Sequence, residues 1–181
     1  KGREHQITER AETLDRSEII APCDPIHFKP EDVYDFELEK TLDERVFLPA
    51  FEPHFDTKTP HQINTDISST NRTAGTILGS EITRRFGQSL DDDTYVVHCR
   101  GGGGQSFGAF IPRGLTMELI GDCNDYFGKG LSGGKLIVRP DPRSTFKAED
   151  NIIIGNVALY GATGGTAYIN GIAGERFCVR N

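Results

Sequence analysis

Two serines in this chain have the spacing of a catalytic nucleophile. The segment 104–108 is Gly-Gln-Ser-Phe-Gly, which places Ser106 in the G-x-S-x-G pattern of a nucleophile elbow, and Ser132 lies in the related segment 130–134. A serine hydrolase of this kind also needs an acid and then a histidine later in the chain. The last histidine, His98, precedes both serines. The residue order therefore argues against a hydrolase, which is the least favoured alternative.

Three glycines match a dinucleotide-binding fingerprint. Gly128, Gly130 and Gly133 have the G-x-G-x-x-G spacing, in which the third glycine opens a helix whose N-terminus receives the pyrophosphate. Here the third glycine is followed by Leu-Ile-Val at 136–138, which is typical of a strand. We therefore interpret the match as accidental.

The two serine segments belong to a pattern that occurs three times. It is found at 104–108, at 130–134 and, as Gly-Ala-Thr-Gly-Gly, at 161–165, and a short apolar run follows each copy. Repetition favours a structural element used several times over several separate active sites. The pattern predicts turns of a repeat, with structural serines at their centres.

Other segments could hold a phosphate or a cation. The run Gly101–Gly104 could cradle a phosphate with its backbone amides, but no Lys-Ser or Lys-Thr follows it, which favours a tight turn. Asp91, Asp92 and Asp93 could bind a divalent cation, but they follow a predicted helix end and resemble a solvated loop.

Histidines and cysteines show no spacing typical of metal ligands. No metal-ligand spacing relates the histidines His54, His61 and His98. No C-x-x-C pair occurs among the four cysteines Cys23, Cys99, Cys123 and Cys178. We expect free thiols, most of them buried. The residues thus predict no catalytic, cofactor-binding or metal-binding site in this chain.

Composition divides the chain into two halves. Residues 1–93 hold four of the 21 glycines, with 11 basic and 20 acidic side chains, whereas residues 94–181 hold seventeen glycines, with 9 basic and 7 acidic side chains. A net charge of -7 does not suit nucleic-acid binding. No apolar stretch is long enough to span a membrane, and residues 1–10 lack a signal-peptide core. We expect no nucleic-acid partner and no membrane insertion.

Helical patterns are confined to the first half. Residues 1–30 contain three prolines and predict an irregular arm, and 31–50 predict one amphipathic helix that ends at Pro49. A loop between Pro53 and Pro60 comes next. A second helix is expected to start at Thr70 or Asn71 and to stop at Gly87.

Short apolar runs bounded by turn residues fill the second half. They are 95–97, 107–111, 115–120, 136–138, 152–154, 158–160, 167–169 and 177–179. No helical pattern separates them, which leaves an antiparallel sandwich or a parallel β-helix. Glycine density favours the β-helix, because its sharp corners need residues that tolerate positive φ. The predicted fold class is therefore all-β, a parallel β-helix preceded by an irregular arm with about two α-helices.

Several longer strings of residues resemble a known family. They are 64–87, 104–108, 121–134, 153–156, 159–163 and 173–177. Together they resemble the C-terminal G-x-G-x-G domain of the glutamate synthase large (alpha) subunit, well over 61–181 and loosely over 31–60. The resemblance implies a right-handed parallel β-helix for residues 61–181, with 1–60 as a linker. Because the family pattern continues past Arg180 and Asn181, we expect the domain to be truncated at its C-terminal end.

The resemblance also implies a function and partners. The parent enzyme of that family makes L-glutamate from L-glutamine and 2-oxoglutarate, with an amidotransferase domain and a synthase domain that holds FMN and an iron-sulfur cluster. Its N-terminal nucleophilic cysteine and its closely spaced cluster cysteines have no counterparts here, since Lys1 starts this chain. No cofactor is therefore expected in this chain, and its expected role is non-catalytic scaffolding of those two domains.

Some points stay open at this level. A small reductase subunit or ferredoxin is implied as a further partner of the parent, and the electron donor is undetermined. The compartment is expected to be the cytoplasm, with a plastid as the other candidate. A β-helix subunit of another redox complex, such as formylmethanofuran dehydrogenase, is the alternative with the same architecture, because its glycine repeats are similar.

Overall fold

The computed structural model describes residues 30, 31 and 33–181. The chain divides into two units, Lys1–Asp35 and Phe36–Asn181, and the helices and strands of the described residues all lie in the second unit. The irregular arm predicted over residues 1–30 lies almost entirely outside the described residues.

The first helical region begins later and ends later than its sequence pattern predicts. It consists of a 3-10 turn η2 (Leu38–Lys40), a π-helical turn η3 (Asp43–Phe47) and the helix α2 (Leu48–Phe55). Pro49 was expected to end the helix, but α2 continues directly from η3 and runs through Pro49 and Pro53 to Phe55. Phe47, Phe51 and Phe55 recur every four residues, so all three are buried on one face.

The second helix, α3 (Thr76–Phe86), ends as predicted and begins elsewhere. Gly87 terminates it and donates its N–H to the Thr83 carbonyl at 2.9 Å. Its N-cap residue is Gly75 instead of Thr70 or Asn71. The cap comes from η3, because the buried carboxylate of Asp43 accepts hydrogen bonds from the N–H groups of Gly75 and Leu78, both at 2.9 Å.

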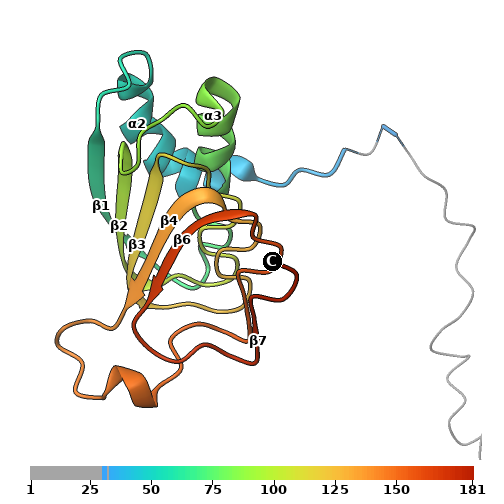
Figure 1. Cartoon of the computed structure of the whole chain (residues 1–181). Helices are drawn as coiled ribbons and strands as arrows, with labels where there is room; N and C mark the ends of the chain where they lie inside the picture. Colours follow the sequence, from blue (N-terminus) through green and yellow to red (C-terminus); the bar gives the residue numbers. More distant parts are fainter. Residues whose placement is uncertain (1–29, 32) are drawn as a thin grey trace, which may run out of the picture. The chain divides into compact units, whose positions relative to one another are not determined.

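Five parallel strands form the main sheet in the order β1-β2-β3-β4-β6 (Figure 1). The strands are β1 (His61–Ile67), β2 (Tyr95–Gly102), β3 (Leu115–Asp122), β4 (Ser132–Arg139) and β6 (Gly164–Ile169). Each of the pairs β1–β2, β2–β3, β3–β4 and β4–β6 is parallel. The spatial order of these strands therefore follows their order in the chain.

The remaining short elements pair beside this sheet. The strands β5 (Val157–Ala158) and β7 (Arg176–Phe177) form a parallel two-stranded sheet, and a 3-10 turn η4 (Ala148–Asp150) precedes them. The predicted strand 107–111 is a turn segment, apart from the pairing of the adjacent Pro112 with Ser132 and Gly133. The predicted strand 152–154 makes only isolated bridges.

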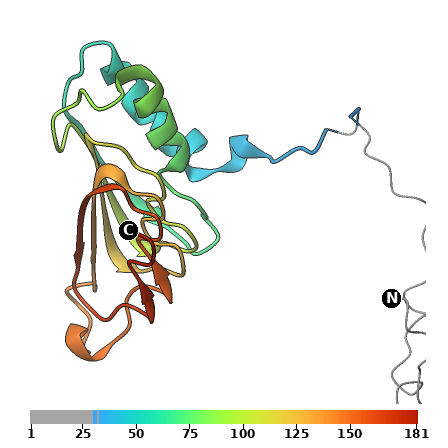
Figure 2. The ribbon, with the colours of Figure 1, turned by 45° about the vertical axis from the view of Figure 1, so that its right-hand side comes forward.

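The prediction of an all-β, right-handed parallel β-helix is wrong. The structure has a five-stranded parallel sheet with flanking helices, an α/β-like arrangement. The prediction failed because β1 was not recognised. With β1 in place, α3 is the crossover helix between two parallel neighbours, and β1–α3–β2 is a βαβ unit. Figure 2 shows α2 and α3 side by side at one end of the sheet.

Register across the sheet builds one continuous core. Val97 of β2, Met117 of β3 and Leu136 of β4 occupy matched positions and are fully buried. At the end of the sheet nearest the helices, Tyr95 contacts the rings of Phe51 and Phe55, both at 5.4 Å between centroids. The helices therefore pack on the first residues of the strands, which fixes where the strands start.

Backbones approach unusually closely at the opposite end of the strands. Ile67, Gly101 and Gly121 form one row across β1, β2 and β3. A Cβ atom at Gly101 would overlap the carbonyl oxygen of Ile67, and one at Gly121 would overlap the carbonyl oxygen of Gly101. Only glycine fits these two positions.

Replacing Asp43 with asparagine tests the cap of α3. Asparagine offers one acceptor oxygen instead of two, so we expect Asp43→Asn to lower the free energy of unfolding by about 1–2 kcal/mol. Burial raises the pKa of the Asp43 carboxyl despite its backbone hydrogen bonds. The stabilising contribution of Asp43 is therefore complete below its ordinary pKa and declines as pH rises through the folded-state pKa.

Urea unfolding of both proteins at several pH values measures this dependence. The difference between wild type and Asp43→Asn should shrink as the pH rises above the ordinary aspartate pKa of about 3.9. The exposed Asp56, replaced by asparagine, controls for the loss of one charge. A difference that grows with pH would mean that burial does not dominate at Asp43.

Alanine at Gly121 tests the close approach of the strands. We expect Gly121→Ala to cost about 3 kcal/mol, because the new methyl group forces β2 and β3 apart. The matched control is Gly164→Ala at the start of β6, where an added Cβ meets nothing within 4 Å. Equal unfolding midpoints for the two variants in thermal denaturation would contradict this account.

Candidate functional site

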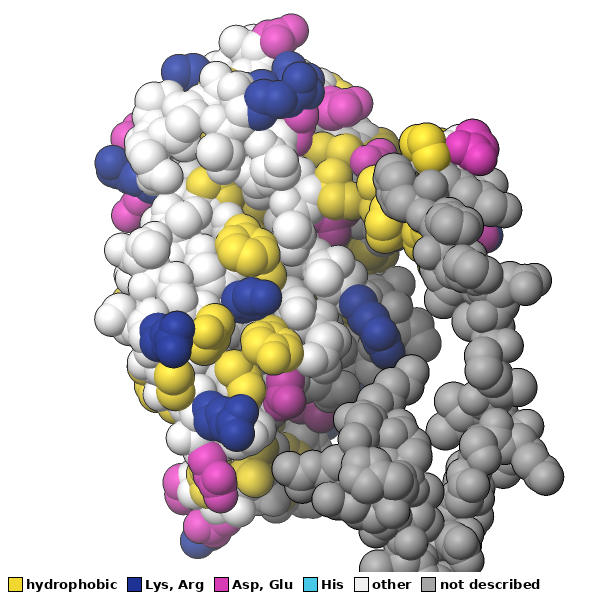
Figure 3. All heavy atoms as spheres, turned by 90° about the vertical axis from the view of Figure 1, so that its right-hand side faces the viewer, with side chains coloured by type: hydrophobic (Ala, Val, Ile, Leu, Met, Phe, Trp, Pro, Cys, Tyr) yellow, Lys and Arg dark blue, Asp and Glu magenta, His cyan; other side chains and the backbone are white. Residues whose placement is uncertain are grey.

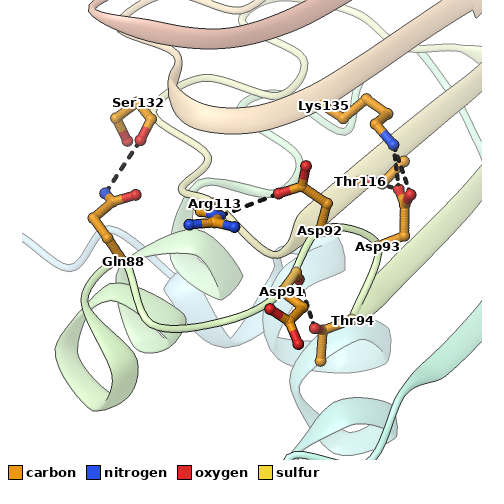
Figure 4. Close-up of polar contacts among 9 residues, drawn as sticks. All are labelled: Gln88, Asp91, Asp92, Asp93, Thr94, Arg113, Thr116, Ser132 and Lys135. Carbon is orange, nitrogen blue, oxygen red and sulfur yellow. Dashed lines mark hydrogen bonds and ion pairs between the residues drawn. The ribbon is translucent and has the colours of Figure 1, made fainter.

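The acidic triplet does not form a cation site. Figure 4 shows the side chains of Asp92 and Asp93 turned toward different partners, whereas Asp91 is joined to Thr94 through its backbone carbonyl. Asp92 pairs with Arg113 at 3.2 Å, and Asp93 accepts hydrogen bonds from Thr116 and Lys135, both at 2.6 Å. The carbonyl of Asp91 accepts a hydrogen bond from the Thr94 hydroxyl at 2.6 Å. Within residues 30, 31 and 33–181, no group of three His, Cys, Asp or Glu side chains is arranged to hold a metal ion.

Asp93 instead ties three strands together. Hydrogen bonds from Lys135 and Thr116 hold the pKa of its carboxyl below the ordinary value. Since Thr116 lies on β3 and Lys135 on β4, the loop before β2 is anchored to the two strands that come after β2 in the sheet. The triplet is therefore a structural junction.

Of the two candidate serines, Ser106 lies in a turn and Ser132 is the first residue of β4. The Ser132 hydroxyl donates to the carbonyls of Phe110 and Ile111 at 3.2 and 3.3 Å, and Gln88 donates to the Ser132 carbonyl at 3.2 Å. Ser106 has a left-handed backbone, with φ of 60°, and its N–H donates to the Asp125 carbonyl.

The register of the strands places Ser132 far from His98. His98 is matched to Glu118 and, through it, to Ile137, which lies five residues along β4 from Ser132. At a rise of about 3.3 Å per residue, that offset is roughly 17 Å, far beyond hydrogen-bond reach. The pair does not form a nucleophile with its base.

The glycine motifs also belong to strands and backbone hydrogen bonds, and they do not form binding loops. Gly133 lies within β4, so the predicted strand is confirmed at the point where a dinucleotide fold would begin a helix. In the run Gly101–Gly104, the first two residues belong to β2, and the N–H of Gly103 donates to the Asp122 carbonyl at 2.8 Å. That pairing does not fit a loop whose free amides receive a phosphate such as that of FMN.

The described cysteines are free thiols, and two are buried. Cys99 on β2 and Cys123 after β3 are buried, and Cys178 is partly exposed. Burial raises the pKa of Cys99 to about 12 and that of Cys123 still further. They do not fit the ligand set of an iron-sulfur cluster, which needs several converging thiolates. Cys23 lies outside the described residues.

A polar network on the outer face of the sheet is the feature that sequence reasoning missed. Glu118 on β3 accepts hydrogen bonds from His98 on β2 at 2.6 Å and from Arg139 on β4 at 2.7 Å. Partial burial opposes the ionisation of Glu118, yet the bonds from Arg139 and His98 outweigh it and lower its pKa. The signal was available, because His98 and Arg100 alternate with buried Val97 and Cys99 along β2.

A hollow of about 320 Å³ adjoins this network. Its lining includes Asn64 and Asp66 of β1, His98 and Arg100 of β2, and Ile120 of β3. Arg100 pairs with Asp141 at 3.3 Å. A surface with these donors and acceptors can hydrogen-bond a partner, and the Arg100 guanidinium already faces a carboxylate within the chain.

The loop predicted between Pro53 and Pro60 starts later, because α2 continues to Phe55, and the histidines on either side of the remaining loop stack on each other. His54 lies in the last turn of α2 and His61 starts β1, with ring centroids 4.0 Å apart. Phe51 contacts His61 edge-on at 5.7 Å. The two rings join the helix to the edge strand.

Among the described residues, no helix is long and apolar enough to cross a membrane.

Comparison with known families gives one matching model. Residues 43–181 match the family described as the GXGXG motif.

Individual relatives are long proteins. The chain is 48% identical over 179 residues to the glutamate synthase [NADPH] large chain of Bacillus subtilis, a match that covers 95% of this chain and 11% of that protein. It is 49% identical over 148 residues to the glutamate synthase [NADH] of Schizosaccharomyces pombe, a match that covers 81% of this chain and 7% of that protein. It is 49% identical over 125 residues to the ferredoxin-dependent glutamate synthase 2 of Synechocystis, a match that covers 69% of this chain and 8% of that protein. The chain thus spans about a tenth or less of the length of these relatives.

Thiol labelling tests the burial of the cysteines. In the double variant Cys23→Ser/Cys178→Ser, we expect the two remaining thiols to react with an aromatic disulfide reagent about a thousandfold more slowly at pH 8 than an ordinary thiol, because little thiolate forms. Denaturant should restore the full rate. A variant that keeps only Cys178 provides the comparison, and equal rates in both folded proteins would contradict the burial of Cys99 and Cys123.

Proposed function

The chain belongs to the GXGXG family as a domain of the glutamate synthase large-chain type, and from that membership we propose that it is a non-catalytic structural domain of such a chain. The observation that carries this proposal is the extent of the match. Almost the whole chain corresponds to about a tenth of a Bacillus subtilis large chain, so most of that protein lies outside this domain.

The hydrogen bonds made by the candidate functional side chains support a structural role. The candidate nucleophile Ser132 donates to backbone carbonyls, and the candidate cation ligand Asp93 is bonded to Thr116 and Lys135. His98 and Arg139 both bond Glu118. Each of these groups therefore has a contact that holds the fold together.

The partners in this proposal are the other domains of the same large chain. They are the amidotransferase domain and the synthase domain, and FMN and the iron-sulfur cluster belong to the synthase domain. The parent activity is then the formation of L-glutamate from L-glutamine and 2-oxoglutarate. Relatives are named for NADPH, NADH or ferredoxin, so the electron donor of this parent is undetermined. The compartment, cytoplasm or plastid, stays a prediction.

A domain exchange tests the proposal. This chain replaces the matching segment of the Bacillus subtilis large chain, to which it is 48% identical, and glutamate formation from glutamine and 2-oxoglutarate is measured. We expect an active chimera, because the packing of a structural domain survives at this level of identity.

Serine variants of the chimera separate scaffolding from catalysis. Ser106→Ala and Ser132→Ala should leave kcat within about twofold, since neither hydroxyl contributes to chemistry in this proposal. Gly121→Ala should reduce the amount of assembled enzyme and not the kcat of what remains. A well-folded Ser132→Ala chimera that has lost most of its kcat would show a catalytic role.

A further inference from the structure

The turns that connect the strands stack on one another and form a distinct surface. The N–H of Phe110 donates to the Lys129 carbonyl at 2.8 Å, that of Gly130 to Tyr160 at 2.8 Å, and that of Gly161 to Val179 at 3.3 Å. Equivalent positions of successive turns therefore lie in a column. We call this surface the corner face, and define it as Phe110, Tyr126, Lys129 and Tyr160. Figure 3 shows hydrophobic side chains alternating with Lys and Arg on this side of the molecule.

Phe110 is presented to solvent by a strained backbone. Its φ is 63°, in the left-handed region that non-glycine residues rarely adopt, and its side chain is 51% exposed. The ring lies over Gly130, where a Cβ atom would collide with it. A bulky apolar side chain held outward in such a conformation indicates a contact made with another surface.

Lys129 is positioned by aromatic rings. Its ammonium lies 5.9 Å from the centre of the Phe110 ring and 5.2 Å from that of Tyr126, whose φ of 64° is also left-handed. Within the described part of the chain, no carboxylate pairs with Lys129. The corner face therefore offers oriented positive charge between apolar side chains.

A groove opens beside Phe110. It has a volume of about 520 Å³ and lies between α3 and the start of β4, with Phe110 and Ser132 on one side and Thr83 and Arg84 among its residues on the other. The Thr83 hydroxyl donates to the Gly79 carbonyl at 2.8 Å, so it is already bonded. The groove can accept an apolar side chain without leaving that hydroxyl unpaired.

We propose that the corner face docks an extended acidic segment of a neighbouring domain, with a carboxylate on Lys129 and an apolar side chain in the groove beside Phe110. This inference rests on the proposed function, since it names the surface through which the structural domain acts. Charge complementarity selects an acidic partner, and the interleaved apolar side chains select a peptide segment over a polyphosphate chain.

Side-chain exposure in the active chimera tests the inference. Hydroxyl-radical labelling of Tyr126 and Tyr160 is compared between the isolated chain and the Bacillus subtilis chimera. We expect labelling of these rings to fall several-fold in the chimera, because the docked segment excludes water from them.

Two variants separate docking from folding. Phe110→Gly removes the ring and relieves the left-handed backbone, so the isolated chain should unfold at nearly the same temperature while labelling in the chimera rises. Lys129→Glu should also raise the labelling in the chimera, because the new carboxylate repels the acidic segment. The isolated chain should again unfold at nearly the same temperature. The matched controls are Lys58→Gly, another left-handed position, and Lys147→Glu, in the segment between β4 and β5; neither should change the labelling.

The outcomes distinguish this inference from the proposed function. An active chimera whose corner face is labelled as strongly as the isolated chain overturns the inference and leaves the structural role intact. A chimera that neither assembles nor makes glutamate counts against the structural role itself. Protection that appears in the isolated chain at high concentration and disappears on dilution would assign the face to a second copy of the chain, which also overturns the inference.

Discussion

The close approach of neighbouring backbones at the end of the sheet is the constraint on which the rest of this fold depends. Gly101 and Gly121 sit in one row with Ile67, and neither position has room for a methyl group. Glycine permits the strands to stay paired at that end, where any side chain would overlap the carbonyl oxygen of the neighbouring strand. The buried residues Val97, Met117 and Leu136 are then brought into line, and the outer partners His98, Glu118 and Arg139 come within bonding distance.

The opposite end of the sheet is held by side chains. Tyr95 packs on Phe51 and Phe55 of α2, and Asp43 caps α3 from the preceding π-helical turn. Burying the carboxyl of Asp43 costs free energy unless backbone donors compensate it, and the N–H groups at the start of α3 are those donors. The helices, the crossover and the first strand pair are therefore one interlocked unit.

Sequence reasoning found the turns and most strands because glycine and apolar runs mark them locally. It missed β1, whose residues His61 to Ile67 are mostly polar because the strand lies at the sheet edge, and without β1 the helix α3 had no strand to connect. That one omission produced the wrong fold class. The acidic triplet was expected as a solvated loop, but its partners Arg113, Thr116 and Lys135 are 21 to 42 positions away in sequence, where local patterns carry no information. The network at Glu118 was hidden for the same reason, since it depends on register across three strands.

Strand order that follows chain order also bears on how the domain forms. Each strand of the main sheet pairs with the strand before it in the order β1-β2-β3-β4-β6, so no pairing has to wait for a distant part of the chain. Loop-closure entropy rises slowly, by about 0.6 kcal/mol for each doubling of loop length, and each closure here joins strands that are neighbours in this order. Folding can therefore begin at the β1–α3–β2 unit and advance strand by strand as the polypeptide leaves the ribosome. At every stage of that growth, the most recently added strand is the template on which the next one is laid.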